Sequence, residues 1–339
     1  MQHQQKINMA TLIATALLLG STGLAAADEA APAAKPVTEQ LVDTMTKLAN
    51  GPYKGFRANH AKGIMAEGTF TPSSEAAGIS KAPHLQGVPS PVLVRFSNAT
   101  GVPTIADADG KAMPKGMAIR FTLPDGSSTD IVAISVNGFP AATPEDFLGL
   151  LNAVAASGAD VAAPKPVEQF LASHPAAMKF VSTPKPAPVS FATQPFFGVN
   201  AFQFTNAKGE TQYGRYRIVP VAGAQFLADA EAAQQAPNYL MDELPARLVK
   251  QEAKYRIVLQ LAAASDSVDD ATAVWPDDRK QVEMGVLTLK SAVANSQEAE
   301  RALMFNPLAL PDGIAPSNDP VLLARPGAYA VSYSRRLAN

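Results

Sequence analysis

The residues of this chain with the clearest chemical potential are a tyrosine and two arginines near its end. Arg325 precedes Tyr329 by four positions and Arg336 follows it by seven, so a helix would place all three side chains on one face. A phenol ionises near pH ~10 in water, so a tyrosine that acts as an anion needs a cation beside it. Arg325 is placed to be that cation, which makes Tyr329 a candidate metal ligand. Alone, the pattern also fits an amphipathic helix with buried tyrosines and solvated arginines.

The histidines do not form a metal site by themselves. His3 lies at the N-terminus, and His84 and His174 each neighbour a proline in loop-like sequence. No two histidines have the spacing of three or four residues that suits a metal site on a helix, so we do not expect a histidine-based zinc or iron centre. His60, near the start of a predicted strand, is by itself compatible with a hydrogen-bonded structural residue.

The elements that must position these residues are mainly strands. Alternation of apolar and polar residues, bounded by turn residues, predicts strands over 64–70, 91–98, 116–121, 129–136, 201–205, 212–219, 255–261 and 281–290. Strands spaced this closely predict an antiparallel sheet or barrel. Arg95 lies inside one of these strands and needs an anionic partner if its side chain points inward.

Helices are predicted between and after these strands. Apolar spacing predicts a helix over 37–50, another over 167–180, and one that begins at Thr143 as N-cap with Pro144 in its first turn. Residues 305–317 contain several prolines and are predicted to form a loop. In the C-terminal helix, Pro326 directly follows Arg325, so this helix should begin or kink there.

Composition indicates a globular protein without nucleic-acid chemistry. The chain has 339 residues, 47% hydrophobic and 17% charged, which is enough to bury a large core. Its 28 basic and 30 acidic residues leave no basic footprint for nucleic acid. The absence of cysteine rules out disulfides, thiolate metal sites and cysteine nucleophiles.

The first 27 residues have the pattern of a signal peptide. Lys6 precedes an apolar stretch from Met9 to Leu19, and alanines at 25–27 fit a cleavage site before Asp28. The apolar stretch is too short to span a bilayer, and no later stretch is long enough. We expect an exported mature protein without a membrane span, in the periplasm, with a retained anchor as the alternative. Residues 28–50 should form a linker and a short helix.

Several short motifs occur in a fixed order along the chain. They are Arg57-Ala-Asn-His60-Ala-Lys-Gly63, Val94-Arg95-Phe-Ser97, Val274-Trp-Pro276, Glu283-Met-Gly-Val-Leu-Thr-Leu289, Phe305-Asn-Pro, Gly313-Ile-Ala-Pro316 and Arg325-x-x-x-Tyr329. This succession, from about Gly51 to Arg336, resembles the haem catalases and, more closely, their short relatives, the catalase-related peroxidases.

The resemblance implies a fold and a cofactor. The fold would be α+β, an antiparallel eight-stranded β-barrel with packed helices over residues 51–339. The cofactor would be haem, an iron protoporphyrin expected to be haem b, with Tyr329 as its axial ligand. Arg325 would keep that tyrosine ionised. His60, on the other face, would move a proton between the two peroxide oxygens, and Ser97 would orient it.

Further residues take roles by the same resemblance. Arg57, Arg95 and Arg336 would pair with the haem propionates, and Phe139 and Phe147 would line the pocket. The sequence also departs from the family. Ile134 stands where catalases have an asparagine that steadies peroxide, and neither Asn98 nor Asn137 aligns with that position. The family's long N-terminal arm and C-terminal domain have no counterpart, so a shared tetramer and bound NADPH are not implied, although an oligomer is compatible.

Together these features predict a haem peroxidase. It would reduce hydrogen peroxide or organic peroxides and oxidise a small organic electron donor, with weak dismutation of peroxide at most. One alternative is an isomerase of lipid hydroperoxides on the same fold. Another is an exported barrel that binds haem or an apolar ligand without catalysis. A serine hydrolase fits poorly, because Gly-x-Ser-x-Gly is absent.

Overall fold

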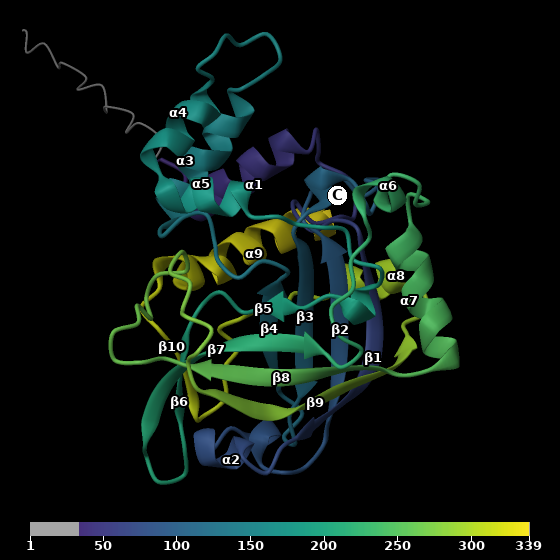
Figure 1. Cartoon of the computed structure of the whole chain (residues 1–339), viewed down its shortest axis with the longest axis vertical. Helices are drawn as coiled ribbons and strands as arrows, with labels where there is room; N and C mark the ends of the chain where they lie inside the picture. The colour runs from purple at the N-terminus through teal and green to yellow at the C-terminus, as the bar shows by residue number, and fades with distance from the viewer. Residues whose placement is uncertain (1–33, 339) are drawn as a thin grey trace, which may run out of the picture. The chain divides into compact units, whose positions relative to one another are not determined.

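Antiparallel strands form a closed barrel in residues 34–338, the part of the chain that the computed structural model describes (Figure 1). In order around the barrel they are β7 (Thr211–Pro220), β5 (Phe196–Phe197), β4 (Ser128–Ile134), β3 (Lys115–Thr122), β2 (Ser90–Asn98), β1 (Gly63–Pro72), β9 (Gln281–Ala292) and β8 (Ala253–Leu261). Pairing of β7 with β8 closes these eight strands into a ring. The predicted eight-stranded antiparallel barrel of an α+β fold is therefore confirmed. The predicted signal peptide lies outside the described residues.

The two faces of each strand have different neighbours because side chains alternate along a strand. In β2, Val92, Val94 and Phe96 point into the hydrophobic core, where the Phe96 ring stacks on Phe191 at 5.0 Å between centroids. The alternate residues Arg95 and Ser97 therefore point the other way, towards the helices. Strand β2 therefore contributes side chains both to the core of the barrel and to its outward face.

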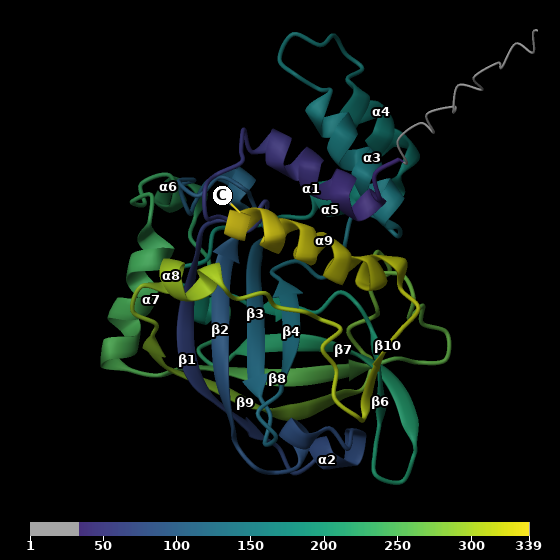
Figure 2. The same ribbon diagram turned by 180° about the vertical axis from the view of Figure 1, so that it is seen from behind.

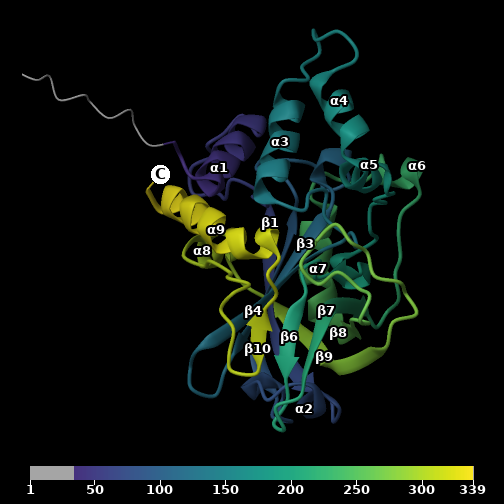
Figure 3. The same cartoon turned by 90° about the vertical axis from the view of Figure 1, so that its left-hand side faces the viewer.

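Helices pack around the barrel. They are α1 (Val37–Leu48), α2 (Ala76–Ile79), α3 (Pro144–Ala155), α4 (Pro166–Ser173), α5 (Pro175–Ser182), α6 (Asp229–Ala232), α7 (Tyr239–Lys250), α8 (Ser296–Arg301) and α9 (Pro320–Ala338). The long C-terminal helix α9 crosses β2, β3 and β4 (Figure 2). Helix α1 packs on both α9 and α3, and these three helices lie together at one end of the barrel (Figure 3). No helix among residues 34–338 combines the length and apolar character that a membrane crossing needs.

Two predictions about the elements were wrong in detail, and one open expectation is narrowed. The helix predicted over 167–180 is two helices, α4 and α5, because Pro175 begins a new helix and its nitrogen cannot bond back to α4. The loop predicted over 305–317 contains a short strand, β10 (Ile314–Pro316), which pairs with β6 (Phe202–Thr205). Helix α9 begins at Pro320 and Pro326 lies inside it, so of the two expectations for this proline, a start or a kink, the start does not apply.

Helix α7 was not predicted at all. Its buried residues Leu240, Leu244 and Leu248 recur every four positions, but Pro245 inside the helix interrupts the sequence pattern. Such a proline removes one backbone hydrogen bond, and packing of the leucine face on the barrel compensates for it.

Candidate active site

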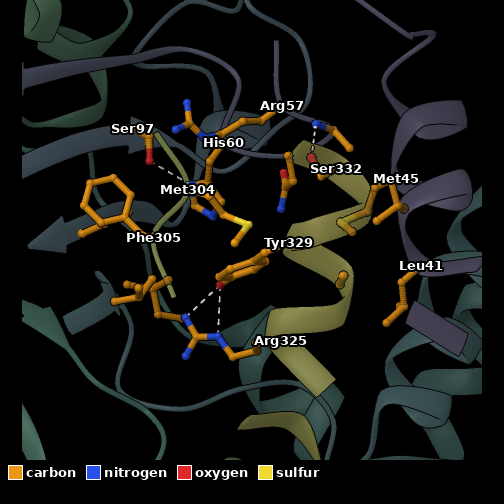
Figure 4. A pocket seen from close by; sticks show the side chains of 18 of the residues that line it. Leu41, Met45, Arg57, His60, Ser97, Met304, Phe305, Arg325, Tyr329 and Ser332 are labelled. Atoms are coloured by element: carbon orange, nitrogen blue, oxygen red, sulfur yellow. Dashed lines mark hydrogen bonds between the residues drawn. The ribbon is translucent and has the colours of Figure 1, made fainter. Parts of the chain in front are cut away.

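A cavity lies between α9 and the outward face of β2, β3 and β4 (Figure 4). His60, Ser97, Tyr329 and Arg325 line it, together with Arg57, Arg95, Arg336, Phe139 and Phe147. All nine residues that the sequence analysis selected therefore converge on one site, although they are up to 279 positions apart (57 and 336).

His60 lies across β3 because a glycine stands beneath its ring. Ser97 of β2 is in register with Gly116 of β3, and a Cβ added to Gly116 would lie 2.8 Å from the His60 ring and from Ser97 Oγ. His60 Nδ1 is 3.0 Å from Ser97 Oγ. Its φ of 54° is unusual for a residue with a side chain and costs about 1–3 kcal/mol, which the surrounding contacts must offset.

The surroundings of His60 keep its imidazole neutral. Burial lowers the pKa of His60 to about 3, and the positive charges of Arg95 and Arg57 act in the same direction. Since Nδ1 is engaged by Ser97, Nε2 is the nitrogen left to exchange a proton in the cavity. A neutral imidazole with one free nitrogen is equipped to accept a proton and return it.

On the opposite wall, Tyr329 and Arg325 form the contact that their spacing predicted. Arg325 donates to the Tyr329 hydroxyl oxygen from Nε at 3.0 Å and from the second terminal nitrogen at 2.9 Å. Both donors point at one oxygen, so the Tyr329 hydroxyl oxygen accepts two charge-assisted hydrogen bonds at the cavity. This geometry makes Tyr329 a candidate oxygen ligand for a metal.

A chain of buried polar groups holds Arg325 in place. Its third contact is to Asn200, whose side-chain oxygen accepts at 2.7 Å. Asn200 in turn donates to Asp319 at 2.7 Å, and Asp319 caps α9 by accepting from the Val321 amide at 2.9 Å. Neither Asn200 nor Asp319 was predicted from the sequence. An aspartate directly before a helical proline and an apolar run is a cap pattern that could have indicated Asp319.

Arg57, Arg95 and Arg336 form a second group at the edge of the cavity. Arg57 and Arg95 both form ion pairs with the buried carboxylate of Glu300, at 3.2 Å for Arg57. Arg57 and Arg336 also donate to the Leu303 carbonyl oxygen, at 2.8 and 3.0 Å. The Nε of Arg336 is buried and has no hydrogen-bond partner. Arg95 was expected to need an anionic partner if it points inward, and its partner in the structure is Glu300, which was not predicted from the sequence.

Apolar side chains form much of the remaining wall. The rings of Phe139 and Phe147 contact each other with centroids 4.9 Å apart. Ile134 also lines the cavity and is in register with Gly116, under the His60 ring. Helix α1 contributes Leu41, Val42 and Met45. The spacing of these three predicted a helix with an apolar face, but not that the face would cover the site.

Asn98 does not replace the missing asparagine. It is fully buried, where it donates to Asp107 at 2.8 Å and accepts from Lys115 at 2.7 Å. Lys62 also pairs with Asp107, at 2.8 Å. This network lies beside His60, Ser97 and Gly116 in the sequence and fixes their backbone segments, so Asn98 serves structure.

The residues present fit a haem group. The phenol oxygen of Tyr329, which accepts from Arg325, faces His60 (Figure 4), and both residues line a largely apolar cavity. At its edge, three guanidinium groups meet only one carboxylate among the described residues, and one buried nitrogen lacks a partner. A flat apolar ring with an iron centre and two carboxylates would use each of these features.

Comparison with known proteins gives one consistent family. The family model described as Catalase matches residues 51–339. A catalase-related peroxidase of Mycolicibacterium paratuberculosis is 35% identical over 301 residues, covering 88% of this chain and 94% of that protein. A catalase-related peroxidase of Synechococcus elongatus is 34% identical and covers 96% of this chain and 95% of its own length.

A solved structure supports the fold. The crystal structure of a fungal catalase matches with a TM-score of 0.75 at 22% identity and covers 88% of this chain. The match spans 63% of the fungal chain, so the likeness extends to the shared barrel and not to all of the larger protein.

Proposed function

Because the chain belongs to the catalase family, we propose that it is a haem-dependent peroxidase that reduces hydrogen peroxide or an organic peroxide and oxidises an organic donor. The observation that carries this proposal is the opposition of two prepared groups across one cavity. One is a tyrosine oxygen fixed by Arg325, and the other is an uncharged His60 oriented by Ser97.

We assign the haem-binding residues as follows. Tyr329 would supply an oxygen ligand to the iron, and Arg57, Arg95 and Arg336 would hold the propionates. Phe139 and Phe147 would pack on the ring. The expected cofactor is haem b. When bound, haem supplies the redox-active iron that exchanges electrons with peroxide and with the donor.

The side chains of the protein then perform the acid–base part of the reaction. His60 accepts a proton at Nε2 from one peroxide oxygen and delivers it to the other, which allows the O–O bond to break with water or an alcohol as leaving group. Ser97 keeps the ring in the orientation that this transfer requires. Arg325 stabilises negative charge on the Tyr329 oxygen throughout.

Ile134 separates the peroxidase proposal from full catalase activity. Dismutation needs a second peroxide to be steadied beside His60, and an isoleucine cannot donate the hydrogen bond that an asparagine would. We propose weak dismutation and preferential oxidation of a small organic donor. The same apolar wall favours, as a second candidate, isomerisation of a lipid hydroperoxide, and an assay with fatty-acid hydroperoxides without a donor separates the two.

The absorption spectrum of the haem-loaded protein tests the central assignment. Tyr329→His should change the ferric spectrum because the axial atom changes from oxygen to nitrogen, whereas Tyr213→His, in β7 away from the cavity, should leave it unchanged. An unchanged spectrum for Tyr329→His would remove the basis of the proposal. His60→Ala should keep haem binding but lose peroxide-dependent oxidation of a phenolic donor, whereas a protein that merely binds haem would show no loss.

We also propose that the chain is exported to the periplasm, on the pattern of residues 1–27. The expected mature protein begins at Asp28. Mass spectrometry of the protein recovered from the periplasmic fraction tests this, and an intact N-terminus at Met1 would contradict it.

A further inference from the structure

A buried glutamate lies against the arginines that we assign to the haem propionates. Glu300 is 5% exposed and is the only acidic residue that forms an ion pair with Arg57 or Arg95 in the described part of the chain. Its main-chain oxygen also accepts from Arg57, at 3.3 Å. Glu300 lies in the last turn of α8, and this turn with the residues that follow it places Glu300 against Arg57 and Arg95 and the Leu303 carbonyl against Arg57 and Arg336.

One carboxylate does not neutralise this cluster. Three guanidinium groups and one carboxylate leave two positive charges in a largely buried region. Burial and, after it, the positive charge of Arg95 lower the pKa of Arg57 to about 8, although Glu300 acts in the opposite direction. The Nε of Arg336 is buried without a hydrogen-bond partner, and Arg336 lines the cavity, so the cluster still has a donor for another acceptor.

We propose that Glu300 is an internal counter-ion that stabilises the arginine cluster in the haem-free protein and leaves two positive charges for the two propionates. This inference rests on the proposed haem-binding function. It assigns to Glu300 a positioning role, since its carboxylate contacts Arg57 and Arg95 and not the reacting atoms.

Loss of the negative charge should affect the two forms of the protein unequally. With Glu300→Gln, the haem-free protein keeps three buried positive charges and no counter-charge, which is destabilising. In the loaded protein, two propionates compensate most of that charge. The haem-free form therefore loses more stability than the loaded form, and by the thermodynamic cycle haem must bind more tightly to the variant.

The test compares thermal unfolding and haem titration of the wild-type protein, Glu300→Gln and Glu298→Gln. Glu298 lies on the same short helix but is exposed, so it serves as the matched control. For Glu300→Gln we expect the Tm of the haem-free protein to fall by about 5 °C or more. Its affinity for ferric haem should rise on the order of tenfold. Affinity for haem dimethyl ester, which lacks the carboxylates, should match that of the wild type.

The outcomes distinguish this inference from the proposed function. A wild-type protein that takes up no haem, or shows no peroxidase activity when loaded, contradicts the proposed function. A wild-type protein that does both, with Glu300→Gln equal to it in Tm and haem affinity, overturns the counter-ion role.

A second variant covers the case in which Glu300→Gln does not fold. The double variant Glu300→Gln with Arg57→Gln restores the net charge of the wild-type cluster. Recovery of a folded haem-free protein supports the inference, because only the charge balance has been restored, and continued failure to fold overturns it. Glu300→Asp, which keeps the charge at shorter reach, should give a Tm between those of the wild type and Glu300→Gln.

Discussion

His60 illustrates how one side chain is prepared by several others. Ser97 holds its Nδ1, Gly116 makes room for its ring, and Arg95 donates to its main-chain oxygen at 2.8 Å. The motif around His60 was enough to predict its place in the site. Its left-handed backbone conformation could not be predicted, because it depends on contacts with β2 and β3.

The low pKa of His60 has a consequence for the pH dependence of the reaction. Because the neutral imidazole is the active form, lowering its pKa to about 3 extends activity towards acid. We expect kcat/KM for peroxide of the loaded protein to stay constant from pH 8 to pH 5 and to fall only as pH approaches 3. Loss of activity with a midpoint near pH ~6.5, the value for a free histidine, would show that His60 is not held neutral in this way.

Ile134 allows a gain of activity to be tested. Ile134→Asn places a hydrogen-bond donor beside His60 and should raise oxygen evolution from hydrogen peroxide by about tenfold or more. The control is Val132→Asn, two residues earlier on the same face of β4 and also at the cavity. Equal oxygen evolution from both variants would mean that position 134 does not limit dismutation.

At the scale of elements, helix α9 carries Arg325 and Tyr329, which lie on the side of the cavity opposite His60. Its N-cap Asp319 is linked through Asn200 to Arg325, and thus to Tyr329. The spacing of Arg325 and Tyr329 was sufficient to predict their contact. Pro326 suggested a later start, but the helix continues through it, since capping by Asp319 fixes its first turn upstream. The pairing with Asn200 joins residues 125 positions apart and left no sequence pattern.

Removal of Asn200 should loosen this side of the site without unfolding it. Asn200→Ala leaves one Arg325 nitrogen and one Asp319 oxygen without their partner, which should cost about 1–3 kcal/mol of stability. We also expect a shifted ferric haem spectrum, because Arg325 is less well fixed against Tyr329. Asn318→Ala, an exposed neighbour of the N-cap, is the comparison, and chemical denaturation with absorption spectroscopy measures both effects. A spectrum equal to that of the wild type would show that Arg325 does not need Asn200.

At the scale of the molecule, the outward face of the closed barrel forms one side of the cavity and carries Arg95, Ser97 and Gly116. Alternation and close spacing of the strands made an antiparallel sheet or barrel predictable, because apolar residues at every second position need a common core. The closed eight-stranded form was expected from the resemblance to the family. The short strands β5 and β10 were not predictable, since two or three residues show no period and pair only because their neighbours hold them there. Glu300 was missed for a similar reason, because its partners come from distant segments.

The barrel core also contains a titratable group that should make stability depend on pH. His84 is buried, lies 5.0 Å from the Phe121 ring between centroids, and has no partner for Nδ1. Burial lowers the pKa of His84 to about 4. The unfolded chain then binds a proton below pH ~6.5 while the folded chain does not, so stability present above that pH is lost as pH falls towards 4.

Substitution of His84 tests this dependence. Between pH 7 and pH 4 the free energy of unfolding should fall by up to about 3 kcal/mol more in the wild type than in His84→Phe. Leu85→Ala, a buried neighbour without a titratable group, should lower stability at every pH and keep the wild-type dependence. If His84→Phe loses as much stability as the wild type on acidification, other groups are responsible.

The cavity is walled by α1 at one end of the described chain and by α9 at the other, and the two helices pack on each other. A nascent chain that still lacks α9 has neither Tyr329 nor one of the two helices against which α1 packs. It therefore offers no pocket to a cofactor, however much of the barrel has already formed. Haem can therefore be held only after α9 has been synthesised and has packed on the barrel and on α1.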